Sequence, residues 1–453
     1  MNVPFDMNYF LAFGFIGICI FVGVLLRAKV PLLQRFLVPS CMIGGILGMI
    51  AINLGWVPLD ENLFQGIAYH FFIISFISIG LTRTVPGTGE KHNTRERLRG
   101  AFWMGMMNGA SMASQAFIGC VMVLLFGLFG VVIPLQFGLF LPLGFTQGPG
   151  QALAIGKAWE AAGLTNAVTI GLAFAAIGFV FALFVGIPIV NWGIRKGYSK
   201  MGKVELPDYF RRGTYREDQI GESMGTMTTH AANVDSLAFQ AGAVGIAYLL
   251  TYIGFILLER FTGELKSSTW GFFFFYGMLS GLLIKFIMNK TGSGYLLDTN
   301  TQNRITGFSV DILVAATLIS VRLSVVWDNI VALMLITIVG GIWTTFMVFY
   351  FGRRMNILGF ERMCVQYGVN TGTISTGLLL LRVVDPEFKT GVALETGLYS
   401  IFATPFILGA MLVIVYYPQW GLNIYQQMGI YLGMFVLTLV LMKVFKVWGK
   451  KAW

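Results

Sequence analysis

The sequence predicts an all-α polytopic membrane protein with two inverted five-helix repeats, each containing a re-entrant hairpin, and one extra C-terminal transmembrane helix. Three observations lead to this prediction. The chain is strongly apolar, its basic residues cluster between apolar runs, and two apolar runs are broken in the middle by glycine and polar residues. Composition indicates the class of protein, the charges indicate the direction of each span, and the breaks distinguish hairpins from ordinary spans.

The composition excludes several classes of protein. With 56% hydrophobic and 11% charged residues among 453, the chain is too apolar for a soluble protein. Long apolar runs, rather than alternating ones, exclude a transmembrane β-barrel. The net charge of +10 comes from residues beside the spans, where it reports orientation, so no nucleic-acid partner is expected. The cysteines fall singly in apolar runs and are expected to be core residues: Cys19, Cys41, Cys120 and Cys364.

Signatures of enzymes are lacking. The sequence contains no nucleotide-binding glycine loop, zinc-binding His/Glu helix or nucleophile elbow in the required context. We therefore expect no enzymatic activity and no cofactor.

The first repeat is expected to cover residues 1–194. Its predicted spans are 9–26, 37–56, 67–85, 101–129 and 166–194. Basic residues follow the first, third and fifth of these spans: Arg27, Lys29 and Arg35; Lys91, Arg95, Arg97 and Arg99; Arg195, Lys196, Lys200 and Lys203. The positive-inside rule makes these ends cytoplasmic, so the N-terminus is expected outside. In the second span, Gly44 and Gly45 should allow close helix approach.

The first hairpin is expected at about 137–160. The run is broken at Phe145-Thr146-Gln147-Gly148-Pro149-Gly150-Gln151, and such a break cannot lie against lipid because each unpaired backbone group there costs several kcal/mol. The preceding span ends outside and the following one ends in the cytoplasm. The segment must therefore enter from the outside and return there.

A polar linker at 195–240 is expected to join the repeats on the cytoplasmic side and to be mobile in part. The second repeat, 241–417, is expected to run in the opposite sense, with an external turn around Glu264. Its predicted spans are 241–258, 270–288, 305–326, 330–351 and 391–417. A second broken run follows Arg353 and Arg354, giving a hairpin at about 361–383 that enters from the cytoplasm.

Residues 418–453 are expected to form the additional transmembrane helix, at about 425–445, and a basic tail. The tail carries Lys443, Lys446, Lys450 and Lys451, which predicts a cytoplasmic C-terminus.

The two breaks are the predicted binding site of a secondary transporter. Broken helices expose free N–H groups that can hold an anionic group of the substrate, and free carbonyls that can bind Na⁺. Glycine pairs that merely pack a kinked helix would explain one such segment, but two at matching places favour a site. The candidate substrate ligands are Thr146, Gln147, Gly148, Gly150, Gln151, Asn370, Thr371, Gly372, Thr373, Ser375 and Arg382.

Asp311 and Thr376 are the candidate residues for ion coupling. A carboxylate within a span should face the bundle interior, where Asp311 can coordinate a cation or carry a proton. Arg322 follows eleven residues later and is expected on the same helix face. A purely structural role for both charges stays open.

Two local ion pairs compete with roles in binding. Arg382 can bind a carboxylate in bidentate fashion, but Asp385 offers it a neighbouring partner. Lys157 and Glu160, at i and i+3, are expected to pair with each other.

These hairpins and their flanks resemble the bacterial sodium/glutamate symporter family. The resemblance runs to about residue 417 and depends mainly on the first half. Its carriers are Val38-Pro39, Gly44-Gly45, Ile79-Gly80-Leu81, Gly148-Pro149-Gly150-Gln151-Ala152, Gly163-Leu164-Thr165-Asn166-Ala167, Gly178 and Gly186-Ile187-Pro188, with Gly368, Gly372, Thr373 and Gly377 in the second half. It implies inverted five-helix repeats, Na⁺-driven glutamate uptake in the bacterial inner membrane, and a homodimer whose transport domains move against a scaffold.

The chain departs from the family at both breaks. Thr146-Gln147-Gly148-Pro149-Gly150-Gln151 stands where the family typically has Gly-Gly-His-Gly-Thr-Gly, and Gly368-Val369-Asn370-Thr371-Gly372-Thr373-Ile374-Ser375 replaces its Gly-Xaa-Gly-Xaa-Gly-Ala-Thr-Pro run. The extra C-terminal helix is a further departure. We expect a sodium symporter for glutamate or a related amino acid or small carboxylate. A proton-coupled or 2-hydroxycarboxylate carrier and a passive channel stay open as alternatives.

Overall fold

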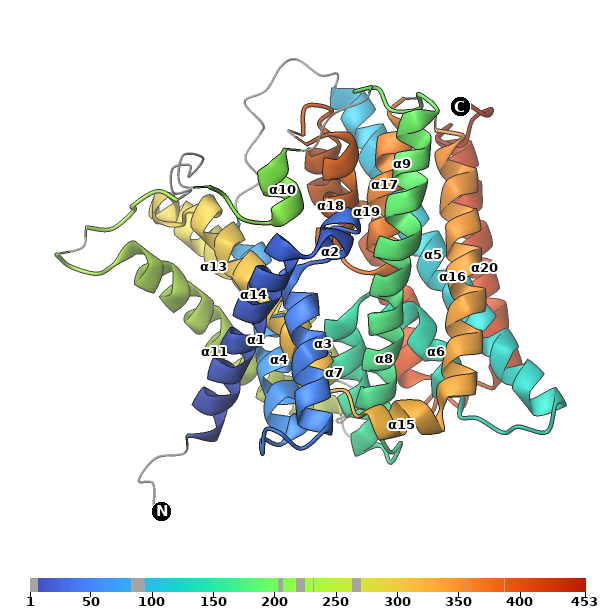
Figure 1. The fold of residues 1–453 in the computed structure, drawn as a ribbon, viewed down its shortest axis with the longest axis horizontal. Coiled ribbons are helices and arrows are strands. Elements are labelled where there is room, and N and C mark those ends of the chain that lie inside the picture. The colour runs from blue at the N-terminus through green and yellow to red at the C-terminus, as the bar shows by residue number, and fades with distance from the viewer. Residues whose placement is uncertain are drawn as a thin grey trace.

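The computed structural model describes residues 7–82, 94–202, 207–216, 225–230, 232–262, 270–355, 357–386 and 388–453. Within these ranges the protein is helical and has no strands, as the sequence predicts. Nine of the described helices are long and apolar enough to cross a membrane. The protein is therefore an all-α, multi-pass membrane protein (Figure 1).

The first half of the chain ends in a helix with an irregular turn. Its elements are α1 (Asn8–Lys29), α2 (Pro31–Arg35), α3 (Ser40–Asn53), α4 (Glu61–Leu81), α5 (Thr94–Leu128), α6 (Leu135–Gly144), α7 (Pro149–Ala161), α8 (Ala167–Val180) and α9 (Gly186–Arg195). A π-helical turn, Phe181–Val185, joins α8 to α9 and makes them one span, Ala167–Arg195. The Tyr367 hydroxyl donates to the Phe181 carbonyl at 3.4 Å.

The second half has two short helices between long ones, as the first half does. Its elements are α11 (Ser236–Thr262), a 3₁₀ turn (Trp270–Phe272), α13 (Phe273–Lys290), a 3₁₀ turn (Gly294–Leu296), α14 (Thr299–Ile319), α15 (Leu323–Asp328), α16 (Ile330–Gly352), α17 (Gly359–Thr371), α18 (Ile374–Val384), α19 (Val392–Tyr416) and α20 (Ile424–Val444).

The helices pack in two groups. Helices α1, α3, α4, α11, α13 and α14 contact one another, and α5 is the centre of the other group, where it packs against α6, α16, α17, α19 and α20. In Figure 1 the first group lies to the left and the second to the right. Helix α7 contacts α4 and α14, so the first pair of short helices lies where the two groups meet.

Glycines allow close approach in the first group. A Cβ atom on Gly44 would collide with the Cys19 carbonyl of α1, and one on Gly45 would lie 2.8 Å from Leu318 of α14. Bulkier residues at these two positions would therefore force the helices apart. The predicted role of Gly44 and Gly45 is confirmed. All four cysteines are buried and free, as predicted for core residues.

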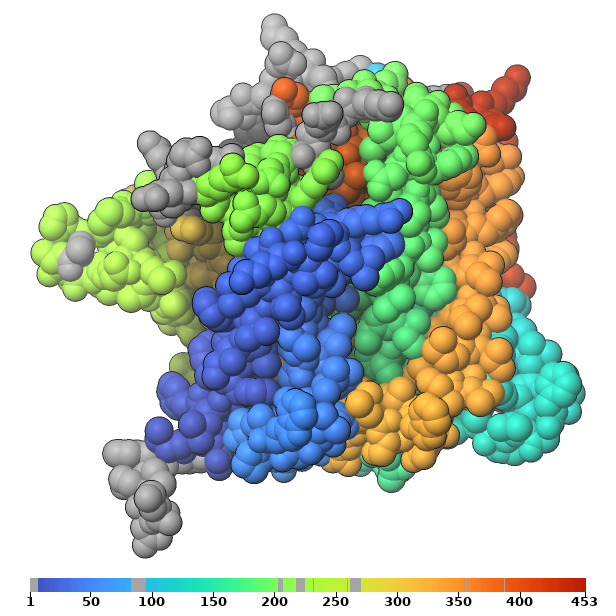
Figure 2. All heavy atoms as spheres, in the orientation of Figure 1, coloured from blue at the N-terminus to red at the C-terminus, as the bar shows by residue number. Residues whose placement is uncertain are grey.

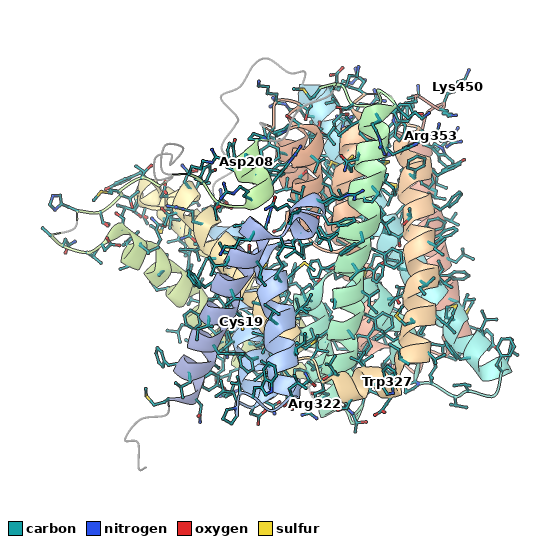
Figure 3. All side chains as sticks on the ribbon, in the orientation of Figure 1. Cys19, Asp208, Arg322, Trp327, Arg353 and Lys450 are labelled. Atoms are coloured by element: carbon teal, nitrogen blue, oxygen red, sulfur yellow. The ribbon has the colours of Figure 1, made fainter. Side chains whose placement is uncertain are left out.

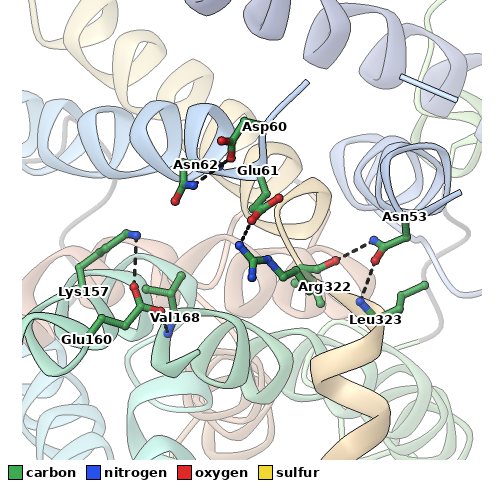
Figure 4. A network of polar contacts seen from close by, with 10 residues as sticks. Asn53, Asp60, Glu61, Asn62, Lys157, Glu160, Val168, Arg322 and Leu323 are labelled. Atoms are coloured by element: carbon green, nitrogen blue, oxygen red, sulfur yellow. Dashed lines mark hydrogen bonds and ion pairs between the residues drawn. The ribbon is translucent and has the colours of Figure 1, made fainter. Parts of the chain in front are cut away.

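The prediction of a span at 305–326 is wrong at its end. Helix α14 stops at Ile319, because the Asn53 side chain of α3 binds the backbone beyond it. Its Nδ2 donates to the Val321 carbonyl at 2.9 Å and its Oδ1 accepts from the Leu323 N–H at 2.8 Å (Figure 4). Arg322 therefore does not share a helix face with Asp311, which is a second correction.

The predicted span 37–56 is also shorter than expected. It forms only α3, whose 14 residues rise about 21 Å, less than the roughly 30 Å of a membrane core. Pro39 precedes the helix and disfavours a helical conformation for Val38 before it. Helix α14 is likewise not among the nine apolar spans, because its first turns are polar.

The linker at 195–240 is described only in part. It contains α10 (Asp208–Arg212), which lies against α1 and α2 (Figure 2), and Arg27 Nη2 donates to the Phe210 carbonyl at 3.1 Å. Helix α11 begins within the predicted linker. Four predicted features lie outside the described residues: the end of the third span at Val85, Lys91, Lys203 and the turn at Glu264.

Candidate substrate and ion site

The first break, residues 145–148, separates α6 from α7. Gly148 has φ +81° and ψ −177°, a conformation that is essentially restricted to glycine. Pro149 follows at the first helical position, where its missing N–H costs nothing. No side chain caps α7, so the N–H groups of its first turn have no side-chain acceptor at the cap. Sequence and geometry thus agree on an open helix N-terminus.

The second break consists of Gly372 and Thr373 and separates α17 from α18. Thr373 and Thr376 form a capping box, in which the Thr373 N–H donates to Thr376 Oγ1 at 2.8 Å. The Thr376 hydroxyl also lies 2.9 Å from the Gly368 carbonyl of α17. One threonine therefore fixes the first turn of α18 and ties it to α17.

The two breaks touch. A Cβ atom on Gly148 would lie 2.9 Å from the Gly372 carbonyl and 3.2 Å from Thr373 Cγ2. Helix α8 crosses beside them, since a Cβ atom on Gly178 would lie 2.6 Å from the Thr371 carbonyl. Segments more than two hundred residues apart in the sequence thus meet through their backbones, in a space that only glycines leave open.

Gln115 of α5 joins the two breaks by hydrogen bonds. Its Oε1 accepts from the Thr146 hydroxyl at 2.7 Å, and its Nε2 donates to the Asn370 carbonyl at 3.1 Å. The same Nε2 donates to Thr344 Oγ1 of α16 at 2.9 Å. Gln115 is fully buried, so these bonds form without competition from solvent.

Asn370 extends this network along α17. Its Oδ1 accepts from Asn108 Nδ2 of α5 at 2.8 Å, and its Nδ2 donates to Gln366 Oε1 at 3.0 Å. We call Asn108, Gln115, Thr146, Thr344, Gln366 and Asn370 the central network. All six side chains are buried.

Three buried polar atoms in or beside the central network have no partner in the part of the chain that the structure describes. They are Ser111 Oγ, Gln151 Oε1 and Gln366 Nε2. Ser111 lies on α5 between Asn108 and Gln115, and Gln151 lies in the first turn of α7. Leaving such groups unsatisfied costs about 1–3 kcal/mol each, so they indicate a place where a ligand or ion can bind.

The candidate residues that the structure gathers are those at the two breaks. Thr146, Gln151, Asn370, Thr371 and Thr376 are buried there. The remaining candidates at the breaks are Gly148, Gly150 and Gly372, which are buried, Gln147 and Thr373, which are half-buried, and Ser375, which is exposed.

The charged candidates lie elsewhere. The expectation that Asp311 faces the bundle interior is wrong, because its side chain is exposed on α14; its carboxylate accepts a hydrogen bond from the Cys41 thiol of α3. Arg382 is exposed, and its guanidinium lies 5.1 Å from the centre of the Phe388 ring. Asp385 does not pair with it but accepts from the N–H groups of Lys389 and Thr390.

Two ion pairs lie near α7 (Figure 4). Lys157 Nζ lies 3.2 Å from Glu160 Oε2, which confirms the predicted pairing. Arg322 pairs with Glu61 at the N-terminus of α4. In Figure 3, Arg322 and Trp327 lie at the opposite end of the molecule from Arg353 and Lys450.

Sequence reasoning missed the polar residues of α5 and also Thr344 of α16 and Gln366 of α17, which are not among the predicted site residues. Asn108, Ser111 and Gln115 recur at i, i+3 and i+7, which places them on one helix face. Polar residues at this spacing within an apolar span indicate a polar helix face, and this pattern could have identified them from the sequence. Their partners are far away in the sequence and could not be deduced from it.

Comparison with known proteins gives one finding. The profile of the sodium/glutamate symporter family matches residues 5–367, most of the chain, and ends before the second break. No curated protein and no solved structure matches. The matched part contains the first break, the α5 residues of the central network and most of α17. The chain belongs to the sodium/glutamate symporter family.

Proposed function

We propose that the protein is a sodium-coupled symporter that imports glutamate or a related amino acid or small carboxylate, bound where the two breaks meet. The observation that carries this proposal is the contact between the breaks and their joint attachment to Gln115. The uncapped N-terminus of α7 and three buried polar atoms without a partner among the described residues lie at this place. We infer sodium-coupled transport from the family, and we infer the position of the binding site from this geometry.

Each pair of short helices is proposed to be a re-entrant hairpin. Helices α6, α7, α17 and α18 have 10, 13, 13 and 11 residues, or about 15–20 Å each, too short to cross a core of roughly 30 Å. If the hairpins enter from opposite faces, such limbs bring their tips together near the middle of the membrane. The contact between Gly148 and Gly372 supports this arrangement.

The packing also supports two inverted repeats. In that scheme α3 corresponds to α13, α4 to α14, α5 to α16, and the α8–α9 span to α19. Helix α4 packs on α13 as α14 packs on α3, and α5 packs on α19 as α16 packs on α8. The corresponding helices α4 and α14 pack on each other, as expected about a pseudo-twofold axis. Helix α20 has no counterpart.

The proposed chemistry assigns separate tasks to the breaks. The open N-terminus of α7 offers N–H groups to a substrate carboxylate, with Gln147 and Gln151 beside it. Hydroxyl and carbonyl oxygens at the second break, including those of Thr371 and Thr373, are hard ligands suited to Na⁺. Because the tips touch, an ion on one and a substrate on the other favour the same closed arrangement, which couples their binding.

The proposed orientation places the N-terminus outside and the C-terminus in the cytoplasm of the bacterial inner membrane. Arg353 and Lys450 lie at one end of the molecule (Figure 3), and positive residues favour the cytoplasmic side. A homodimer, as the family resemblance implies, is part of the proposal.

Uptake of radiolabelled glutamate into proteoliposomes tests the function. We expect saturable uptake that requires an inward Na⁺ gradient and is inhibited by unlabelled small carboxylates. A Gly14→Ala protein should show the same uptake and serves as a control for glycine substitutions, because nothing lies within 4 Å of a Cβ atom at this position. Flux that neither saturates nor responds to Na⁺ would instead establish a passive channel.

Asp311 distinguishes sodium from proton coupling. If Asp311 serves the coupling ion, Asp311→Asn should raise the Na⁺ concentration needed for half-maximal uptake several-fold, or abolish acceleration by a proton gradient. An unchanged Na⁺ titration would assign the residue a structural role beside Cys41.

A further inference from the structure

A cavity lies away from the breaks, where α5 and α17 begin and α16 and α20 end. Its volume is about 80 Å³, several times what one water molecule needs. Its lining residues are Glu96, Arg99, Arg354, Met355, Ile357, Arg362, Lys446, Val447 and Gly449. Four of these are cations and one is a carboxylate, so the cavity is basic.

The deepest cation is already neutralised. Arg362 is 1% exposed and forms a bidentate pair with Glu395 of α19, with two N···O distances of 2.7 Å. It also donates to the carbonyls of Ile357 and Glu96. Arg362 therefore builds a rigid floor and contributes no net charge to a ligand.

The other three cations are unpaired. No ion pair joins Arg99, Arg354 or Lys446 to a carboxylate within the described ranges. Against them stands Glu96, the one carboxylate of the lining. Three positive charges around one small cavity repel one another unless an anion lies between them.

Hydrogen bonds to backbone carbonyls hold the two arginine side chains in place. Arg99 Nη2 donates to the Lys446 carbonyl at 2.7 Å, which ties α5 to the end of α20. The Arg354 guanidinium lies 3.6 Å from the centre of the Tyr350 ring, and Nη1 donates to the Tyr350 carbonyl at 2.9 Å. The Gly449 N–H donates to the Arg354 carbonyl at 3.0 Å. The guanidinium groups of Arg99 and Arg354 are therefore arranged before any ligand arrives, whereas Lys446 contributes an exposed ammonium group beside them.

We propose that this cavity binds a phosphate-bearing anion, held by Arg99, Arg354 and Lys446. Two sources share this chemistry, an anionic lipid headgroup and free phosphate. The lipid is favoured by its surroundings, because Val444 and Phe445 at the end of α20 are 65% and 57% exposed and offer apolar surface for an acyl chain. Basic pockets between transmembrane helices bind lipid headgroups in this way. The proposal holds whichever solute is transported.

Lipid binding to the purified full-length protein tests the proposal. Native mass spectrometry would measure the affinity for phosphatidylglycerol, phosphatidylcholine and inorganic phosphate, and thermal unfolding would report stabilisation by each. We expect binding of phosphatidylglycerol but not phosphatidylcholine. Each of Arg99→Gln, Arg354→Gln and Lys446→Gln should weaken it about fivefold, while Lys446→Arg keeps it.

Lys450→Gln is the matched control, because Lys450 is exposed on the same tail but does not line the cavity. It should bind phosphatidylglycerol like wild type. Phosphate that competes with the lipid supports the shared site, and phosphate binding without lipid binding assigns the site to the free anion. Equal binding of phosphatidylglycerol to wild type and to an Arg99→Gln/Lys446→Gln double variant, or no binding of either probe, overturns the proposal.

Discussion

The two breaks are similar in sequence character but are stabilised differently. The second break is closed by its own residues, since Thr373 and Thr376 cap α18 and Thr376 reaches back to α17. Helices α17 and α18 also pack on each other more extensively than α6 and α7 do. The first break has no side-chain cap and depends on Gly148, Pro149 and its bond to Gln115. The second break is therefore fixed by its own side chains, whereas the first break depends on a side chain of α5.

The largest effect is expected at the point of contact. Gly148→Val places a β-branched residue in a backbone conformation that costs about 1–3 kcal/mol and pushes its Cβ against the Gly372 carbonyl. Na⁺-driven uptake should fall about 100-fold while the protein still inserts in the membrane. Gly14→Val, measured in parallel, should transport normally. Full uptake by Gly148→Val would show that the two tips need not meet.

The second largest effect is expected at Gln115, which bonds to both breaks. Gln115→Leu removes the bonds to Thr146, Thr344 and Asn370 and leaves buried groups unsatisfied, at about 1–3 kcal/mol each. We expect about tenfold slower uptake and a lower melting temperature. Thr438→Val, a buried change in α20 that breaks only a bond to the Phe435 carbonyl, is the control. Normal uptake by a Gln115→Leu protein would show that transport does not require the attachment of both breaks to Gln115.

Threonine substitutions compare the tips directly. Thr376→Val destroys the capping box, at about 1 kcal/mol, and should lower the melting temperature with at most about fivefold loss of uptake. Thr146→Val should instead raise the substrate concentration for half-maximal uptake, because we propose that the substrate carboxylate binds at the first break. The reverse pattern, measured by thermal unfolding and uptake kinetics, would exchange the roles of the two breaks.

The smallest effect is expected away from both breaks. Arg322 is 46% exposed in its pair with Glu61, and exposed pairs contribute about 0–1 kcal/mol. Arg322→Gln should leave uptake unchanged and shift the melting temperature only slightly. A double-mutant cycle with Glu61→Gln measures the coupling, and a large loss of transport would give this end of α4 a functional role.

The sequence was sufficient for features determined by local chemistry. The breaks follow from Gly148, Pro149 and Gly372, and Lys157 pairs with Glu160 because they are three residues apart on a helix. The family resemblance that the motifs indicate is confirmed over residues 5–367.

Features made by side chains from distant segments were not predictable in the same way. Helix α14 ends early because Asn53 captures its backbone, Arg362 is neutralised by Glu395, and Gln115 bonds to both breaks. A single sequence carries the donors and acceptors but not their pairing. Asp311 and Arg382 are predicted to be site residues because they are charged, but both lie away from the breaks. The residues that meet at the breaks carry neutral amides and hydroxyls.

The neutrality of the central network has a consequence for how the protein responds to its surroundings. Its six side chains are amides and hydroxyls, which neither gain nor lose a proton in the physiological range. The connection between the two tips is therefore the same in acidic and alkaline medium. Any pH dependence of transport must therefore come from the solute itself or from a titratable group outside the central network. The hydrogen bonds that join the two breaks do not change with pH.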